Sequence, residues 1–591
     1  MNWFSSLLMA VPCAMVLMAQ APNESSTAAR RARLKTALRD EWEYTLRTNP
    51  ELATSVGDNR YNDRLSDYSA EASLAQVDHA RQALPVFEAI DTTGFPEQER
   101  LNRDLMIRGL HQQIEAGKFK DWEMPVDQMN GVHLGLASLP SGTTFHSVKD
   151  YQDYIARLHQ IPRVLNQATV NMRAGLADHL VPPRFLLEKV VLQVQDIANK
   201  SVKDSPFTQP VHDFAAGIAE GDQKFLRDAV YAAVQQDVAP AYSRLAEFLR
   251  TEYAPRGRAE DGVWALPDGD ARYRFCVKVM TTTKLGPEEI HQMGLKQVAE
   301  IELEMLTIAR QQGYNNLASF NAHIRQEHKL YGTSGEQIFN LYKRYSNQMY
   351  AKLPQLFGHL PKTKLEVVPM EAFRAANSVP ADYSIGAGDG SRPGRINVNE
   401  YDPTHRLLLN VEAIAYHEGI PGHHLQFSIA QEQTELPDFR RFAYFNAYSE
   451  GWAFYAERLG KEVGFYQDPY SEYGRLENEM WRSVRLVVDT GVHSKHWTRR
   501  QMVDFFRVHT AMDDPNIETE VDRYIAWPGQ ALAYKLGQMK IIELRERARQ
   551  QLGERFDLRA FHDALLADGP LPLDVLEANM NQWIAEQKVG K

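Results

Sequence analysis

Helical periodicity runs through most of this 591-residue chain, whereas strand alternation is confined to two short segments. From Ser26 to Leu249 apolar residues recur every three or four positions, and Pro or Gly turns separate successive patterns. A further helix is predicted to begin at Pro287. The strand-like runs are KLEVVPM (364–370) and GRINVN (394–399). We therefore predict a mainly α fold with a small β-sheet.

The segment EYAPRGRAEDGVWALPDGDARY (252–273) concentrates Pro, Gly and charged residues, which is typical of a boundary between structural regions. We predict an N-terminal helical region over 22–270 and a C-terminal region over 271–591.

The first residues, MNWFSSLLMAVPCAMVLMAQA, form an apolar run that is too short to span a bilayer and ends in Ala19-Gln20-Ala21. This pattern predicts a signal peptide over 1–21 and an exported, periplasmic protein. A lipoprotein acylated at Cys13 is the less favoured alternative, because Val11-Pro12 is a poor match to the small residues that precede an acylated cysteine. No later stretch approaches the roughly 18 apolar residues of a membrane span, so no stable span is expected.

The charge balance limits the partners. The chain has 66 Lys and Arg against 77 Asp and Glu, a formal net charge of -11, which is the wrong sign for a protein that neutralises phosphates. A nucleic-acid partner is therefore not expected. Two cysteines, Cys13 and Cys276, cannot form a disulfide framework.

The segment VEAIAYHEGIPGHHLQ (411–426) contains three histidines and a glutamate within eight residues. Zinc on a regular helix is bound by two imidazoles one turn apart, and the Glu after the first His lies beside the activated water. Four residues after His417 the chain has Pro421, which cannot be a ligand. The motif is therefore not an ordinary HExxH, although His417 and Glu418 match its first half.

The second imidazole ligand stays open between two residues. On a straight helix His423 lies about 120° away from His417, and His424 returns to the same face about 10.5 Å further along. Neither residue could then share one ion with His417. Pro421 and Gly422 predict a break that could bring a later imidazole back, and we favour His423 over His424.

Glu450 is the best candidate for the third ligand of a catalytic zinc site, which needs three protein ligands and leaves the fourth position for water. It opens SEGWAFYAE on a second helical pattern, among aromatic residues that favour an inward position. Glu457 shares its face and is a candidate to support a ligating imidazole. A solvated charge on a helix surface is the alternative for both carboxylates.

The motifs HEGIPGHHLQ, SEGWAFYAE, RLVVDTGVH, YIAWPGQALAYKLG and DGSRPG together resemble the bacterial family catalogued as domain of unknown function 885, whose members are regarded as zinc metallopeptidases. The resemblance runs from about Asn49 to the C-terminus. Phe454 stands where Leu is common. The family in turn resembles the mostly helical gluzincins, such as carboxypeptidase Taq, thimet oligopeptidase and angiotensin-converting enzyme, from which the Pro-Gly insertion departs.

This resemblance implies a helical metallopeptidase-like fold with an edge strand beside a deep active-site cleft. It also implies a late His and Tyr that stabilise the oxyanion, for which His493 with Tyr524 or Tyr534 is the candidate pair. Arg485, Asp489 and His493 fall at i, i+4 and i+8, so the carboxylate could hold both neighbours. A salt-bridged helix face and an aromatic core are the alternatives for these residues.

We therefore expect a zinc-dependent hydrolase that cleaves short peptides. Its Zn²⁺ would be held by His417, His423 or His424, and Glu450, with Glu418 as general base. The preference for peptides rests on the resemblance. The alternatives are a zinc amidase or esterase that acts on a non-peptide metabolite, and a catalytically silent binding protein of the same fold.

Overall fold

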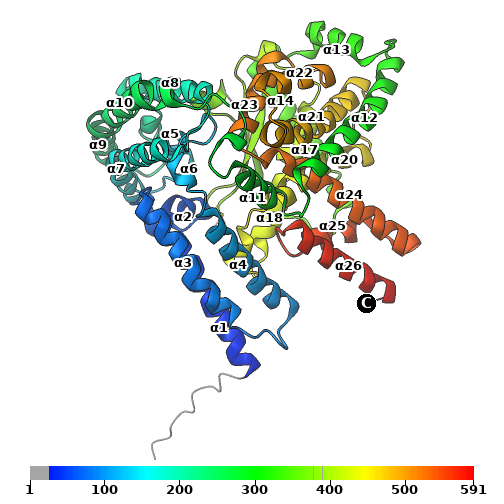
Figure 1. Cartoon of the computed structure of the whole chain (residues 1–591), viewed down its shortest axis with the longest axis horizontal. Coiled ribbons are helices and arrows are strands. Elements are labelled where there is room, and N and C mark those ends of the chain that lie inside the picture. Colours follow the sequence, from blue (N-terminus) through cyan, green and yellow to red (C-terminus); the bar gives the residue numbers. More distant parts are fainter. Residues whose placement is uncertain (1–25, 377, 389, 591) are drawn as a thin grey trace, which may run out of the picture.

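The computed structural model describes residues 26–376, 378–388 and 390–590, and it is shown in Figure 1. Helices account for 71% of the chain and strands for 3%, which confirms the mainly α prediction. The predicted signal peptide (1–21), including Cys13, lies outside the described residues. Within those residues, none of the helices combines the length and apolar character needed to cross a membrane.

From residue 26 on, where the described part of the chain begins, ten α-helices precede the predicted boundary. They are α1 (Thr27–Thr48), α2 (Pro50–Val56), α3 (Ala70–Glu88), α4 (Glu97–Ala116), α5 (Val132–Ala137), α6 (Leu139–Gly142), α7 (Val148–Asp178), α8 (Arg184–Asn199), α9 (Glu220–Ala233) and α10 (Ala239–Phe248). Apolar side chains of α5–α10 bury one another in a core of their own. Figure 1 shows α7–α10 gathered on one side of the molecule.

The remaining elements form the other side of the molecule. They are α11 (Gly269–Thr281), α12 (Pro287–Gln311), α13 (Leu317–Gln326), α14 (Gly335–Tyr350), α15 (Leu353–Leu356), β1 (Leu365–Pro369), α16 (Ala372–Ala375), β2 (Ala381–Ser384), β3 (Gly394–Val398), α17 (Val411–Glu418), α18 (His423–Glu432), α19 (Asp438–Arg441), α20 (Asn446–Glu462), α21 (Pro469–Ser494), α22 (Arg499–His509), α23 (Asp514–Ala526), α24 (Ala533–Leu552), α25 (Leu558–Leu566) and α26 (Leu573–Val589). The predicted start of α12 at Pro287 is confirmed.

The small sheet has the strand order β1-β3-β2, in which β3 is parallel to β1 and antiparallel to β2. Ile396 and Val398 of β3 are fully buried and pack against α14 and α17, in a cluster with Ile414. The alternation of side chains along β3 thus fixes α17 against one face of the sheet. The two predicted strands are confirmed, and β2 is an addition to them.

Close contact between α20 and α24 depends on two facing glycines. A Cβ on Gly451 would lie 2.4 Å from the Cα of Gly537, so neither position has room for a side chain. Helix axes can approach this closely only where both residues are small. The contact brings the first turn of α24 beside the part of α20 that carries Glu450.

The two predicted regions share more than one surface. Leu105 of α4 is buried in the C-terminal core with Trp452 and Ile541. Asn102 accepts a hydrogen bond of 2.7 Å from the buried Arg440, and Arg108 pairs with Asp574 at 2.8 Å. α4 therefore packs against the C-terminal region although it precedes the predicted boundary in sequence.

Candidate metal centre

The helix that carries His417 ends at Glu418 and resumes as α18 at His423. The Gly422 N–H donates to the carbonyl of Tyr416 at 2.9 Å, and the His424 N–H donates to that of Gly419 at 3.0 Å. These bonds join residues five and six positions apart, in place of the i to i−4 bonds of a regular α-helix. The chain therefore accommodates extra residues between α17 and α18. The rings of His417 and His423 consequently lie 4.9 Å apart between centroids, nearly perpendicular to each other.

The break requires glycine at position 422. A Cβ there would lie 1.9 Å from the carbonyl oxygen of His417 and 2.4 Å from that of Tyr416. We expect Gly422→Ala to cost at least about 3 kcal/mol of unfolding free energy, because the contacts are with backbone that cannot rotate away. It should also displace His423 and weaken metal binding. Thermal unfolding and a metal titration test this.

Gly109→Ala is the matched control, because a Cβ there meets no atom within 4 Å and the residue lies inside α4. Alanine is the better helix former by about 1 kcal/mol, so this variant should be as stable as the wild type or more so. Equal stability and metal affinity for both variants would contradict the proposed role of Gly422.

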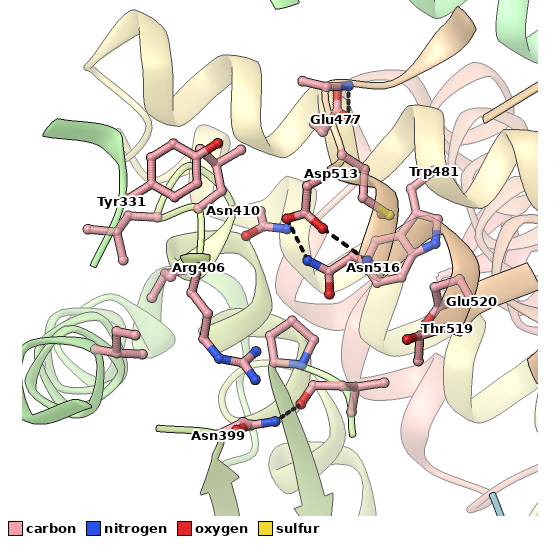
Figure 2. Close-up of a pocket in the computed structure, with 18 of the residues that line it drawn as sticks. Tyr331, Asn399, Arg406, Asn410, Glu477, Trp481, Asp513, Asn516, Thr519 and Glu520 are labelled. Carbon is pink, nitrogen blue, oxygen red and sulfur yellow. Dashed lines mark hydrogen bonds between the residues drawn. The ribbon is translucent and has the colours of Figure 1, made fainter. Parts of the chain in front are cut away.

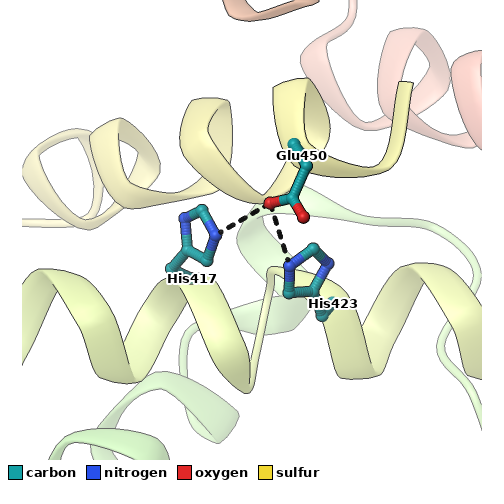
Figure 3. A group of neighbouring side chains, drawn as sticks. All are labelled: His417, His423 and Glu450. Carbon is teal, nitrogen blue, oxygen red and sulfur yellow. Dashed lines mark ion pairs between the residues drawn. The ribbon is translucent and has the colours of Figure 1, made fainter. Parts of the chain in front are cut away.

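Glu450 completes a cluster with the two imidazoles, as Figure 3 shows. Its Oε2 lies 3.5 Å from Nε2 of His417 and 3.4 Å from Nε2 of His423. Potential ligand atoms of the three residues all lie within 4.8 Å of one another, and all three side chains are buried. Two imidazoles and a carboxylate are a ligand set typical of zinc in hydrolytic enzymes.

The electrostatics of the cluster fit a cation. Burial would raise the pKa of Glu450, but His423 and His417 hold it well below its usual range. Burial would lower the pKa of His417, whereas the neighbouring carboxylates of Glu450 and Glu457 raise it to about 9. Glu450 Oε2 is buried without a hydrogen-bond partner among the described residues. Such an orphaned oxygen, between two imidazoles, is a natural position for a metal ligand.

Glu457 lies two turns after Glu450 on α20 and contacts the other nitrogen of His417. Its Oε1 lies 2.9 Å from Nδ1, and its Oε2 accepts a hydrogen bond of 3.0 Å from Asn478. α20 thus places one carboxylate at each nitrogen of the same imidazole. A carboxylate at Nδ1 fixes the tautomer that leaves Nε2 free for a metal.

Replacing Glu457 by Ala should lower metal affinity by about 10- to 100-fold, the usual effect of removing a partner that orients a ligating His. Glu457→Gln keeps an acceptor for the Nδ1 proton and should lose less. Competition with a chelator of known affinity measures both variants, with circular dichroism as the check on folding. Wild-type affinity in a folded Glu457→Ala protein would contradict the orienting role.

His424 lies outside the cluster. Its Nε2 donates to the carbonyl of Thr363 at 3.1 Å, and its Nδ1 accepts from the Tyr383 hydroxyl at 3.1 Å. Burial lowers its pKa to about 4, so the ring is neutral and both nitrogens are occupied. The alternative of His424 as the second ligand is corrected in favour of His423, because the break turns the two neighbouring rings in different directions.

The cluster opens into a cavity of about 330 Å³ that is also lined by Glu418, Tyr534 and residues 378–383, which lead into and include part of β2. The sheet thus borders the site, as expected. Glu418 makes no hydrogen bond to a described side chain, and burial raises its pKa to about 7, partly offset by His417 and His423. A carboxylate with a pKa near neutrality suits a general base.

Tyr534 and Tyr524 have different surroundings. The Tyr534 ring stacks on His417 at 6.1 Å, and its hydroxyl accepts from Arg523 and Gln530, so its own proton has no acceptor among the described residues. The Tyr524 hydroxyl donates to Glu520 and accepts from Arg485 at 2.7 Å. Tyr534 therefore lines the cavity, whereas Tyr524 is saturated and lies outside it.

His493 also lies outside the cavity. Its Nδ1 accepts from the Val263 N–H at 3.0 Å and its Nε2 donates to the Tyr524 carbonyl at 2.9 Å. Burial lowers its pKa to about 3, so the ring is neutral, and its one N–H is already bonded to the Tyr524 carbonyl rather than free for a substrate. The expectations that His493 and Tyr524 act on an oxyanion are therefore wrong.

Asp489 likewise does not hold Arg485 and His493. It accepts from the Tyr273 hydroxyl at 2.6 Å and from the Gly529 N–H at 3.1 Å. This bond ties α21 to the turn before α24. The predicted role of Asp489, to hold Arg485 and His493 in place, is therefore replaced by a structural link to Tyr273 and Gly529.

Several residues of the site were not identified from the sequence. The Tyr444 hydroxyl donates to Glu450 Oε1 at 2.8 Å, and Arg482 and Arg523 line the cavity. Arg482 stands three residues before Arg485 in WRSVR, so the two side chains lie about one helical turn apart on the same face. This spacing could have indicated that Arg482 belongs to the site. Tyr444 precedes α20 in a loop and carried no such signal.

A second, smaller cavity of about 80 Å³ lies next to the first and shares residues 378–380 and Trp481 with it. Figure 2 shows Asn516 of this cavity bonded to Asp513, and the bond is 2.8 Å long. Glu477, whose pKa burial raises to about 7, accepts from the Ala511 N–H. Among the described residues, His417, His423 and Glu450 form the only group of side chains whose arrangement could hold a metal ion.

Fold and site together define a mainly helical protein with a buried His-His-Glu centre suited to a metal. The chain belongs to the family described as "Bacterial protein of unknown function (DUF885)", whose model matches residues 50–580. This confirms the resemblance to domain of unknown function 885. No curated protein matches the chain.

Among the solved structures that resemble the chain are two bacterial proteins. A putative lipoprotein from Colwellia psychrerythraea has 28% sequence identity and a TM-score of 0.89, and the match covers 94% of this chain and 99% of that one. A putative lipoprotein of unknown function from Shewanella oneidensis has 17% identity and a TM-score of 0.68, with 94% and 100% covered. The second likeness concerns the fold alone.

Proposed function

We propose that this protein is a zinc-dependent hydrolase that cleaves amide bonds of short peptides. One observation carries the proposal: ligand atoms of His417, His423 and Glu450 converge within 4.8 Å, and Glu418 lines the same cavity. Three protein ligands with an open fourth position characterise catalytic rather than structural zinc sites. The nitrogen and oxygen donors favour zinc over the all-oxygen sites of Mg²⁺ or Ca²⁺.

A zinc ion bound here would polarise the scissile carbonyl and lower the pKa of a water at the site. Glu418 takes the proton of the attacking water and passes it to the leaving amine, because it is the carboxylate next to the ligands without a partner of its own. Tyr534 donates its free hydroxyl proton to the developing oxyanion. Glu457 keeps His417 in the ligating tautomer.

The choice of peptides rests on the likeness of the motifs to helical zinc peptidases, since the same groups hydrolyse other amides and esters. Export to the periplasm is proposed on two grounds. The apolar N-terminal run ends in Ala19-Gln20-Ala21, and two similar structures are described as putative lipoproteins.

Metal analysis of the purified protein, run beside a peptide-library digest read by mass spectrometry, tests the proposal. We expect about one zinc per chain. We also expect peptide cleavage that stops on chelation and returns when zinc is added. N-acyl and ester libraries serve as parallel substrates.

Each other outcome contradicts part of the proposal. Cleavage of N-acyl compounds or esters alone would identify an amidase or esterase. A zinc-loaded protein that is inert on all three libraries would identify a binding protein. Failure to bind zinc at all would reject the centre itself.

A further inference from the structure

Three arginines line the cavity of the metal centre, Arg482 and Arg485 from α21 and Arg523 from α23. Their exposed fractions are 4%, 1% and 8%. Burying guanidinium groups is costly unless each is paired with an anion and its N–H groups are hydrogen-bonded. If the protein itself does not supply enough such partners to these three groups, a bound ligand is expected to supply the rest.

The two carboxylates next to the three guanidinium groups do not balance all of their positive charge. Glu520 pairs with Arg485 at 2.9 Å and lies 3.7 Å from Arg523. Glu457 lies 3.6 Å from Arg482, but its oxygens are bonded to His417 and Asn478. Burial lowers the pKa of Arg482, and Glu457 offsets only part of this effect.

Several guanidinium nitrogens have no hydrogen-bond partner among the described residues. They are Nε and Nη1 of Arg482, Nη1 of Arg485 and Nε of Arg523. Buried donors in folded proteins are almost always bonded, so four orphaned donors among three arginines that line one cavity indicate a missing acceptor. Guanidinium groups bind carboxylates in a bidentate manner, which makes a carboxylate the fitting acceptor.

The cluster lies close to the metal centre. The guanidinium carbon of Arg485 lies 4.5 Å from the centre of the Tyr534 ring, and those of Arg482 and Arg523 each lie 5.9 Å from it. That ring lies 6.1 Å from the ring of His417. Each guanidinium carbon is therefore at most 12.0 Å from the His417 ring. An extended peptide of about three residues spans this distance.

The cavity adjoins a groove of about 880 Å³ on another side. Cavity and groove share Tyr383, Ile385, Phe427 and Tyr444, whereas none of the three arginines lines the groove. The groove is large enough for the longer part of a peptide chain. A peptide that enters from the groove would reach the metal centre first and the arginines with its end.

We propose that the arginine cluster binds the C-terminal carboxylate of the substrate, so that the protein removes at most about three residues from the C-terminus of a peptide. This inference rests on the proposed peptide hydrolysis and names its substrate class. Arg482 is the central residue, because it has the most unpaired donors and the carboxylate next to it, that of Glu457, is bonded to His417 and Asn478.

Direct binding tests the inference without catalysis. Protein freed of metal by chelation is titrated calorimetrically with an N-acetylated tripeptide that ends in Ala, as the free acid and as the C-terminal amide. The free acid should bind about 10- to 100-fold more tightly, the effect of losing a charge-assisted hydrogen bond or two. An amide that ends in Glu distinguishes an acidic side chain from the chain terminus and should bind as weakly as the other amide.

Variants identify the residue. Arg482→Gln should lose the preference for the free acid while binding the amide as the wild type does, an effect that a merely structural role would not produce. Arg507→Gln is the control, because Arg507 lies on α22, lines neither the metal cavity nor the groove, and pairs with Asp514 at 2.8 Å. Thermal melts check folding, and Arg482→Lys, which keeps the charge, should retain part of the preference.

Equal binding of acid and amide by the wild type would overturn the inference, as would tight binding of the amide that ends in Glu. An unchanged preference in a folded Arg482→Gln protein would do the same. These results are independent of hydrolysis. A protein that binds the acid selectively but cleaves no peptide contradicts the proposed function, whereas cleavage deep inside long peptides contradicts the C-terminal preference alone.

Discussion

Glu418→Gln is expected to cut peptide hydrolysis by about 10²- to 10⁴-fold while zinc content and folding stay near those of the wild type. The carboxamide keeps the size of the side chain and can hydrogen-bond to water, but it cannot accept a proton. Glu418 lines the cavity but is not one of the three residues whose ligand atoms converge, so its replacement leaves the cluster in place. Initial rates and metal analysis of the same preparation measure both quantities.

Glu412→Gln is the matched control. Glu412 lies on the same helix but outside the cavity, where it accepts from the Tyr416 hydroxyl at 2.9 Å. This variant should retain a rate close to that of the wild type. Hydrolysis at the wild-type rate by Glu418→Gln would mean that another group takes the proton.

His423→Ala is expected to reduce zinc from about one ion per chain to a small fraction, because it removes one of three protein ligands. Hydrolysis should be lost with the metal. The adjacent His424→Ala offers an unusually close comparison, because both histidines are buried on the first turn of α18. Since His424 bonds to Thr363 and Tyr383, its loss should affect stability and leave zinc in place.

Glu450→Ala completes this series and should lose zinc as His423→Ala does. Equilibrium dialysis followed by elemental analysis measures all three variants, with thermal unfolding in parallel. Full zinc retention in His423→Ala together with loss in His424→Ala would reverse the ligand assignment, and full retention in Glu450→Ala would remove Glu450 from the site.

Much of the fold could be predicted from periodicity. The strands expected at 364–370 and 394–399 are observed as β1 and β3, and α12 begins at Pro287 as expected. β2 was not recognised because four residues, ADYS, show too short an alternation, and its strand conformation depends on pairing with β3. Such pairing between distant segments leaves no local signal.

In the candidate site, residue types were informative and spacing was not. His417, Glu450 and Glu457 could be selected because each has a chemically suitable side chain on a helix face. The choice between His423 and His424 depended on the path of the chain through Gly422, which packs against the carbonyls of Tyr416 and His417. Positions on a regular helix could not predict that path, because the helix is interrupted between Glu418 and His423.

The errors at His493 and Asp489 have a different origin. α21 is buried continuously from Tyr473 to His493, so the i, i+4, i+8 pattern identifies a face without saying what it contacts. Tyr273, Val263 and Gly529 provide the contacts, and they come from distant parts of the chain. The buried arginines of the same helix were partly overlooked for the same reason.

The packing of α4 bears on proteolysis. A protease that nicks the chain within 252–273 would leave Leu105 in the C-terminal core, with Asn102 bonded to Arg440 and Arg108 paired with Asp574. The two fragments should therefore stay together under native conditions and separate only in denaturant. Cleavage at this site would be visible on a denaturing gel while the nicked protein still elutes as one species.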